Sequence, residues 1–180
     1  EDTPWAKRGH EVAYGQEVLG HMPEAVPSDR PYQVTRGWHN VGVKGQDFEV
    51  LFSILHGGLV SYRYAGKEMI EKIPMPNFWR APVDNDNGSM APARYAQWKI
   101  ASMYISHRNG GMFDNVPTKV EEKDNTVTVT YTYFMPTTPA SKCQVAYTVF
   151  GDGTIETKLM YDPVEGLPDM PEFGMMFCRL

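Results

Sequence analysis

The residues best suited to chemistry lie in one stretch, 76–88, which reads Pro-Asn-Phe-Trp-Arg-Ala-Pro-Val-Asp-Asn-Asp-Asn-Gly. It carries one cation, Arg80, and two acids, Asp84 and Asp86, beside two aromatic and three amide side chains. Two carboxyl groups that are held a few ångströms apart can share the work of an acid and a base. Asp84 and Asp86 are such a pair by residue type, so this stretch is the first place to look for a reaction.

A structural role explains the two acids better than catalysis does. Hydrolysis of a glycosidic bond, for example, needs two carboxyl groups about 5 Å or about 6.5–9.5 Å apart, with one of them protonated. Two acids separated by one residue in a loop that must satisfy its own backbone are more simply explained as ionised caps of N–H groups. We therefore predict no catalytic residue in this chain.

The stretch itself is predicted to be a rigid, non-repetitive loop. Pro76 and Pro82 fix φ, and the pair 87–88, Asn-Gly, favours a turn with positive φ. Arg80 can fork onto a carboxylate, and the Asp and Asn side chains can bond to nearby backbone groups. The residues predicted to hold this loop, or to flank an active site, are Asn77, Arg80, Asp84, Asn85, Asp86 and Gly88.

A metal site is not predicted. Counted from Asp84, a calcium loop would need its sharp-turn glycine at Ser89 and a bidentate Glu at Tyr95, so the spacing fails. The five histidines show neither HxH nor HExxH spacing, which argues against zinc. They are His10, His21, His39, His56 and His107.

Two tryptophans near the loop could stack on a sugar. Trp79 lies within the stretch and Trp98 follows it, and an indole ring can pack on the apolar face of a pyranose. Aromatic residues beside strands more often belong to the core, so core packing is the alternative for both.

Composition and charge restrict the classes of partner. The chain has 180 residues, 42% of them hydrophobic, which suffices for a buried core. With 17 Lys and Arg against 22 Asp and Glu, the net charge of −5 argues against binding the phosphates of nucleic acid. No apolar run approaches the ~20 residues that span a membrane, and no leader of basic then apolar residues opens the chain. A soluble protein is expected, with the compartment left open.

The two cysteines are expected to be buried free thiols. Cys143 and Cys178 lack CxxC spacing and stand in strand-like surroundings, so neither a disulfide framework nor a zinc knuckle is indicated.

The beginning of the chain predicts a domain boundary. Residues 9–19 alternate weakly, as in a single strand, whereas 21–31 contain three prolines with Ser, Asp and Arg, as in an extended linker. A lone strand would leave its edges unpaired, so we interpret it as the last strand of a preceding domain. We assign residues 1–31 to that strand and linker and 32–180 to the main domain, and we expect 1–31 either to pack poorly on the rest or to pair with a neighbouring molecule.

The main domain is predicted to be an antiparallel β-sandwich with one short helix. Alternating or β-rich segments recur between turn signals, and 151–153, Gly-Asp-Gly, is a strong hairpin turn. Pro92 suits the first turn of the single expected helix, 91–103. The expected strands are 33–36, 40–43, 48–54, 59–64, 116–123, 126–133, 142–150, 154–161 and 173–180.

The stretch 77–88 closely resembles the "NFWRAP-DND-G" segment near the start of the last domain of large bacterial β-galactosidases, which are family-two glycoside hydrolases. Further similarities follow in the family's order and cover nearly the whole chain. They are Gly-His-Glu-Val-Ala-Tyr at 9–14, Trp98, Gly-Asp-Gly at 151–153 and Leu-Pro-Asp-Met-Pro-Glu-Phe-Gly-Met at 167–175.

This resemblance implies a piece of a larger enzyme. It would comprise the end of an immunoglobulin-like fourth domain, a linker, and the first half of a fifth domain, part of a β-supersandwich. The parent would hydrolyse terminal β-D-galactosides with retention, using an acid and a nucleophile from another domain and magnesium and sodium ions that are also held elsewhere. No cofactor is expected in this piece, which should be inactive alone.

The role implied for this piece is structural. It would pack on the catalytic barrel and present the segment after Gly88 toward the mouth of the active site, while the aromatic residue offered to substrate lies beyond Leu180. Its partners would be the other domains, with the galactoside bound only by the parent; the oligomeric state stays open. A free-standing carbohydrate-binding β-sandwich is the alternative.

Overall fold

The computed structural model describes residues 2–11, 15, 17, 19–20, 26–108 and 119–178. Residues 12–14, 16 and 18 of the predicted strand 9–19, the start of the linker, the start of the strand predicted at 116–123 and the last two residues of the one predicted at 173–180 lie outside the described residues. The division of the chain into 1–31 and 32–180 therefore stays a prediction.

The first sheet is an antiparallel meander of five strands in the order β1-β2-β3-β4-β5; the sequence predicts the meander and its first four strands, but not the short β5. Ala65 and Gly66 both have positive φ, which is the type I′ geometry that suits a two-residue hairpin turn between β4 and β5. The register shifts at Leu51 and Phe52, where β3 meets β4. The strands are β1 (Gln33–Arg36), β2 (Asn40–Lys44), β3 (Phe48–Ser53), β4 (Gly58–Tyr64) and β5 (Lys67–Glu68).

The second sheet has four antiparallel strands in the order β10-β9-β8-β7. The predicted turn at Asp124 and Asn125 joins β7 to β8, and both residues have positive φ. The predicted Gly-Asp-Gly hairpin joins β9 to β10. These strands are β7 (Lys119–Lys123), β8 (Thr126–Met135), β9 (Ser141–Phe150) and β10 (Ile155–Tyr161).

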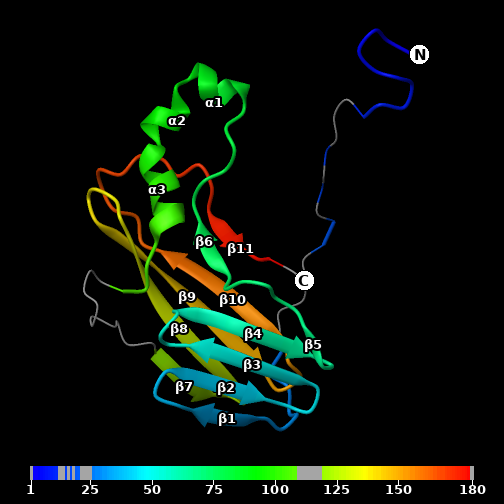
Figure 1. Ribbon diagram of the computed structural model, residues 1–180, viewed down its shortest axis with the longest axis vertical. Coiled ribbons are helices and arrows are strands. Elements are labelled where there is room, and N and C mark those ends of the chain that lie inside the picture. The colour runs from blue at the N-terminus through cyan, green and yellow to red at the C-terminus, as the bar shows by residue number, and fades with distance from the viewer. Residues whose placement is uncertain are drawn as a thin grey trace.

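The core lies between the two sheets, which pack face to face (Figure 1). In β8 the side chains of the Thr-Val-Thr-Val pattern alternate between half-buried and buried, because every second residue points into the sandwich. Phe52 of β3 contacts Tyr147 of β9, with ring centroids 5.6 Å apart. The hydroxyl of Tyr131 lies 3.1 Å from the carbonyl oxygen of Ser53, which ties the second sheet to the first. The fold is thus the predicted all-β sandwich.

A two-stranded ribbon and three short helices stand above one end of the sandwich (Figure 1). β6 (Met75–Asn77) pairs with β11 (Gly174–Met176), so the segments 78–83 and 162–173 come together beside the helices. We call residues 84–104 the helical arm. It consists of α1 (Asp84–Gly88), α2 (Ala91–Arg94) and α3 (Ala96–Tyr104).

The helical content corrects two predictions. The predicted helix 91–103 is present but interrupted at Tyr95, and residues 84–88 form one helical turn instead of a non-repetitive loop. Gly88 lies inside α1, and the positive φ expected at 87–88 falls instead on Met90, φ 57°, which links α1 to α2. Asp and Asn favour turns because their side chains bond to nearby backbone groups. Here the Asp86 carboxylate accepts the backbone N–H of Val83, and that bond caps the start of a helix instead.

The end of the predicted linker packs on the sandwich, so the poor packing expected of residues 1–31 does not hold for residues 28–30. The Asn125 side-chain amide donates to the carbonyl oxygen of Ser28. A Cβ at Gly151 would lie 2.3 Å from the carbonyl oxygen of Arg30, so only glycine allows this close approach. Residues 28–30 therefore lie against the turns of the second sheet.

Candidate functional site

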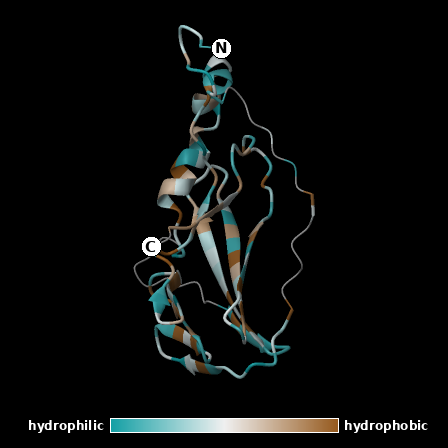
Figure 2. Ribbon diagram, turned by 90° about the vertical axis from the view of Figure 1, so that its right-hand side faces the viewer, coloured by the Kyte–Doolittle hydropathy of each residue, from teal (hydrophilic) through white to brown (hydrophobic). Residues whose placement is uncertain are grey.

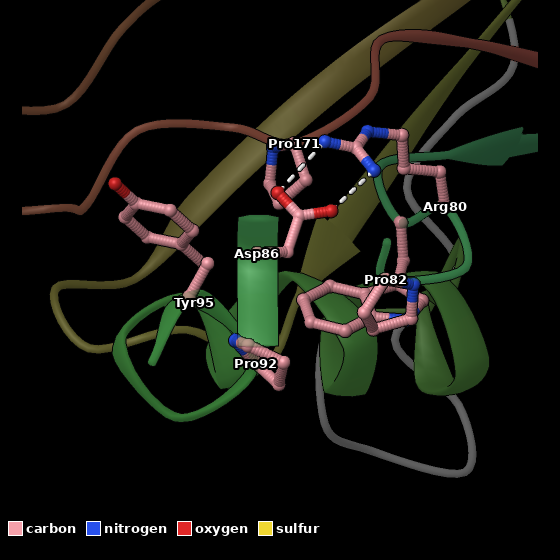
Figure 3. A pocket seen from close by; sticks show the side chains of 8 residues that line it. Arg80, Pro82, Asp86, Pro92, Tyr95 and Pro171 are labelled. Carbon is pink, nitrogen blue, oxygen red and sulfur yellow. Dashed lines mark hydrogen bonds and ion pairs between the residues drawn. The ribbon is translucent and has the colours of Figure 1, made fainter. Parts of the chain in front are cut away.

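The candidate site is a small pocket between the helical arm and the segments that enter and leave the ribbon (Figure 3). Its volume is about 60 Å³, which holds a few water molecules but is far below the ~300 Å³ of common ligand sites. The lining residues are Trp79, Arg80, Pro82, Asp86, Ala91, Pro92, Tyr95 and Pro171.

The segment 77–80, which carries Trp79 and Arg80, is held in place by hydrogen bonds to α3 and within the segment. Phe78 is fully buried, and its backbone N–H donates to the hydroxyl of Ser102 on α3 at 2.8 Å. That hydroxyl in turn donates to the carbonyl oxygen of Trp98, 2.9 Å away. The Asn77 side-chain amide donates to the carbonyl oxygen of Trp79 at 2.8 Å, so side chains fix the backbone on both sides of Phe78.

Arg80 and Asp86 close the pocket on one side. The guanidinium donates to both carboxylate oxygens of Asp86, with N–O distances of 2.6 and 3.0 Å, as the dashed lines of Figure 3 show. Asp86 also accepts the backbone N–H of Val83 at 2.8 Å, which caps the start of α1. Arg80 is therefore paired with a carboxylate, and one of the two acids caps a backbone N–H, as expected from the sequence.

The electrostatics at Asp86 oppose a role as a general acid. The hydrogen bond from Arg80, together with that from the Val83 backbone, holds the pKa of Asp86 below its usual range. The same pair raises the pKa of Arg80 above its ordinary value. An acid catalyst needs a carboxyl group that keeps its proton, whereas Asp86 is stabilised in its ionised form.

The remaining predicted loop residues lie outside the pocket. Asp84 and Asn85 are exposed on the first turn of α1, where a negative side chain is favoured by the helix dipole. Asn77 supports the backbone instead of lining the cavity. Gly88 is exposed at the end of α1. The structure thus brings together Arg80 and Asp86 but does not place Asp84 beside them in the pocket lining.

The two tryptophans occupy different environments. Trp98 is 1% exposed, donates its ring N–H to the carbonyl oxygen of Pro168 at 2.9 Å, and meets Tyr161 edge to face. Burial at this depth leaves the indole no open face for a sugar, so core packing is the correct interpretation for Trp98. Trp79 is half-buried and lines the pocket, and stacking by its ring stays a prediction.

Five lining residues, Ala91 among them, were not predicted as site residues from the sequence. Tyr95, Pro92 and Pro82 flank the acidic run, and Pro171 comes from the distant segment that β11 pulls alongside β6. The guanidinium of Arg94 lies 4.9 Å from the centroid of the Tyr95 ring, a cation–π contact that orients the ring. The Leu-Pro-Asp-Met-Pro similarity at 167–171 was the one available signal for Pro171.

Two further properties concern only the part of the chain that the structure describes. No group of three His, Cys, Asp or Glu side chains gathers there in a way that could hold a metal ion. None of its helices combines the length and the apolar character needed to cross a membrane.

The chain belongs to the family described as beta galactosidase small chain, whose model matches residues 44–179. It is 38% identical to a beta-galactosidase of Clostridium acetobutylicum over 180 residues, and 40% identical to one of Halalkalibacterium halodurans over 182. It is also 36% identical over 149 residues to a beta-galactosidase small subunit of Latilactobacillus sakei.

The coverage of these relatives is unequal. The matches take in 99%, 98% and 76% of this chain, but only 19%, 17% and 47% of the respective relatives. The chain therefore spans less than a fifth of the two long enzymes and about half of the small subunit.

Proposed function

We propose that this chain is a non-catalytic structural part of a larger β-galactosidase, one that hydrolyses terminal β-D-galactosides with retention. In this proposal the chain packs on the catalytic barrel and the segment after Gly88 shapes the mouth of the active site. The observation that carries it is the Arg80–Asp86 pair. The carboxylate best placed to act in the pocket is neutralised by a two-bond ion pair and by a backbone N–H, which suits support and not catalysis.

The family's names support the same assignment. One relative is called a small subunit, and others are single chains of which the matched part is under a fifth. A domain found both as a separate subunit and as a segment of a longer enzyme must keep a surface that binds the remainder. The partners in this proposal are those remaining domains, and the galactoside binds only to the whole.

The proposal also covers the metal ions of the parent enzyme. In this proposal the magnesium and sodium ions that the resemblance implies are bound by other domains of the parent enzyme. The proposal is therefore that chelators leave the thermal stability of the isolated chain unchanged.

A direct test compares the isolated chain with a graft. In the graft, these 180 residues replace the matching segment of the Clostridium acetobutylicum enzyme. We expect no hydrolysis of a chromogenic β-galactoside by the isolated chain and measurable hydrolysis by the graft. Turnover by the isolated chain that disappears in Asp86→Asn or Asp84→Asn would overturn the proposal.

A free-standing carbohydrate-binding module is the second candidate, and Trp79 is the observation that favours it. A half-buried indole beside a guanidinium and a carboxylate can stack on a sugar while polar groups meet its hydroxyls. This module should bind lactose or immobilised glycans in isolation and lose that binding in Trp79→Ala. Binding of this kind, with an inactive graft, would replace the first proposal by the second.

A further inference from the structure

Helix α3 presents apolar side chains on two opposite faces. Its inner face packs on the sandwich through Trp98 and Ala101, which are both buried. Its outer face carries Ile100, Met103 and Tyr104, which are 45%, 61% and 63% exposed. These three follow the i, i+3, i+4 spacing that places side chains side by side on one face of a helix. The outer face is thus a continuous apolar stripe.

No element of the described residues buries that stripe. A surface helix normally pairs its apolar face with a polar one, whereas a helix that is apolar on both faces is normally covered on both. Contiguous exposed apolar side chains mark sites of interaction, and methionine is frequent at such sites. Brown, hydrophobic segments occur in the helical arm of Figure 2 as well as in the strands.

The charged side chains of α2 and α3 are all positive, whereas α1 of the same arm carries Asp84 and Asp86. Residues 87–108 contain Arg94, Lys99 and Arg108 but neither Asp nor Glu, in a chain whose net charge is −5. Lys99 is exposed and lies one turn before Met103, at the border of the stripe. Within the described part of the chain, neither Arg94 nor Lys99 forms an ion pair with a carboxylate.

We infer that the outer face of α3, made by Lys99, Ile100, Met103 and Tyr104, is a docking surface for the part of the β-galactosidase outside these residues. The surface that it meets is apolar at its centre and carries carboxylates at its rim, opposite Lys99 and Arg94. This inference rests on the proposed function and adds to it the face that docks and the chemistry of its partner. A second copy of the chain fits less well, because pairing two α3 faces would bring like charges together.

The test uses one substitution in two settings. Met103→Glu places a carboxylate in the centre of the stripe, and Leu51→Glu, on the outer face of the first sheet, is the control for an added charge at an exposed apolar residue. In the isolated chain both variants should melt within a degree or two of the parent, because both sites are exposed. In the graft, Met103→Glu should lower activity about tenfold or more, because a buried interface charge is costly, and Leu51→Glu should not.

Failure of this inference is distinguishable from failure of the proposed function. If the graft is active and Met103→Glu leaves its activity equal to that of the Leu51→Glu variant, the docking face is wrong and the structural role stands. Lys99→Glu checks the rim separately and should weaken the graft, whereas Lys99→Ala should weaken it less.

A photo-crosslinking amino acid at position 100 provides a readout that does not depend on activity. Irradiation of the graft should join this position to a peptide of the surrounding enzyme, identified by mass spectrometry as apolar with Asp or Glu. Crosslinks to a second copy of the chain, or to no protein at all, would overturn the inference.

Discussion

The sandwich and the helical arm use their apolar residues differently. Between the sheets, the inward-pointing side chains of β8 and β9 are almost all fully buried, and they meet β2, β3 and β4 across a continuous core. In the arm, α3 buries one face and exposes another that is as apolar. The sandwich therefore buries its inward-facing apolar side chains within the chain, whereas in the arm α3 buries only its inner face.

This difference separates the residues that stabilise the fold from those that we propose to dock on the rest of the enzyme. The sandwich gains its stability from burial, which grows with the apolar area removed from water. The arm buries Trp98 and Ala101 on the inner face of α3 and is held in addition by specific bonds, such as Phe78 to Ser102 and Arg80 to Asp86. The following substitutions test this division, in order of the expected effect.

Phe52→Ala should have the largest effect, because the ring is fully buried between the sheets. We expect a loss of about 3–5 kcal/mol in the free energy of unfolding, measured by urea titration. Met103→Ala on the arm is the matched control and should change stability by no more than about 0.5 kcal/mol. Equal losses at the two sites would show that the arm's outer face is packed after all.

Ser102→Ala should follow, because its hydroxyl accepts the buried backbone N–H of Phe78. An unpaired N–H at that depth costs about 1–3 kcal/mol. Ser89→Ala removes a hydroxyl that bonds to the exposed carbonyl oxygen of Asp86 and should be close to neutral. If the two variants unfold at the same urea concentration, water replaces the Ser102 hydroxyl and the anchor is not specific.

Arg80→Ala should destabilise the chain less than Phe52→Ala or Ser102→Ala, since both partners of the Arg80–Asp86 pair reach solvent. Asp84→Asn should melt like the parent, because Asp84 lies outside the pocket. The pKa of Asp86 is lowered in the fold, so the stability from the pair is present at neutral pH and is lost as pH falls through that lowered value.

Thermal melts of both variants with and without galactose or calcium separate support from binding. Stabilisation of the parent by either ligand, with no loss of stability in Arg80→Ala, would mean that the pocket is a ligand site.

His107 should give the smallest effect, visible only as a pH dependence. Burial lowers the pKa of His107, with smaller contributions from Arg108 and His56, although its ring nitrogen lies 2.9 Å from the carbonyl oxygen of Leu55. A lowered pKa means that the unfolded chain binds the proton more readily, so stability declines as pH falls from about 6.5 toward the folded value. His107→Gln should flatten this slope between pH 7 and 5, and an unchanged slope would assign it to other groups.

The sandwich was predictable because its signals are local. Strict Thr-Val alternation in 126–133 requires one buried and one wetter face, and the turns at 124–125 and 151–153 fix how neighbouring strands pair. The stretch 77–88, on which the family resemblance rests, also supplies Trp79, Arg80, Pro82 and Asp86 to the lining of the candidate pocket. Each of these signals depends on residues that are close together in the chain.

The pocket and the arm were harder to predict because they depend on contacts between distant residues. Asn87 and Gly88 favour a turn by residue type, yet they lie in α1. The start of that helix is capped by the hydrogen bond from the Val83 backbone N–H to the Asp86 carboxylate. Pro171 lines the same pocket as Trp79, although the two are far apart in the sequence, because β11 pairs with β6. A sequence pattern also could not show that Trp98 turns inward while Met103, five residues later on the same helix, turns outward.

Hydrogen exchange of the arm in two settings tests the central claim most directly. The amides of α3 and of β8 are followed by mass spectrometry in the isolated chain and in the graft within the Clostridium acetobutylicum enzyme. The account predicts that α3 becomes about tenfold or more better protected in the graft, while β8 is unchanged, because the arm gains a cover and the sandwich already has one. Equal protection of α3 in both settings would contradict it.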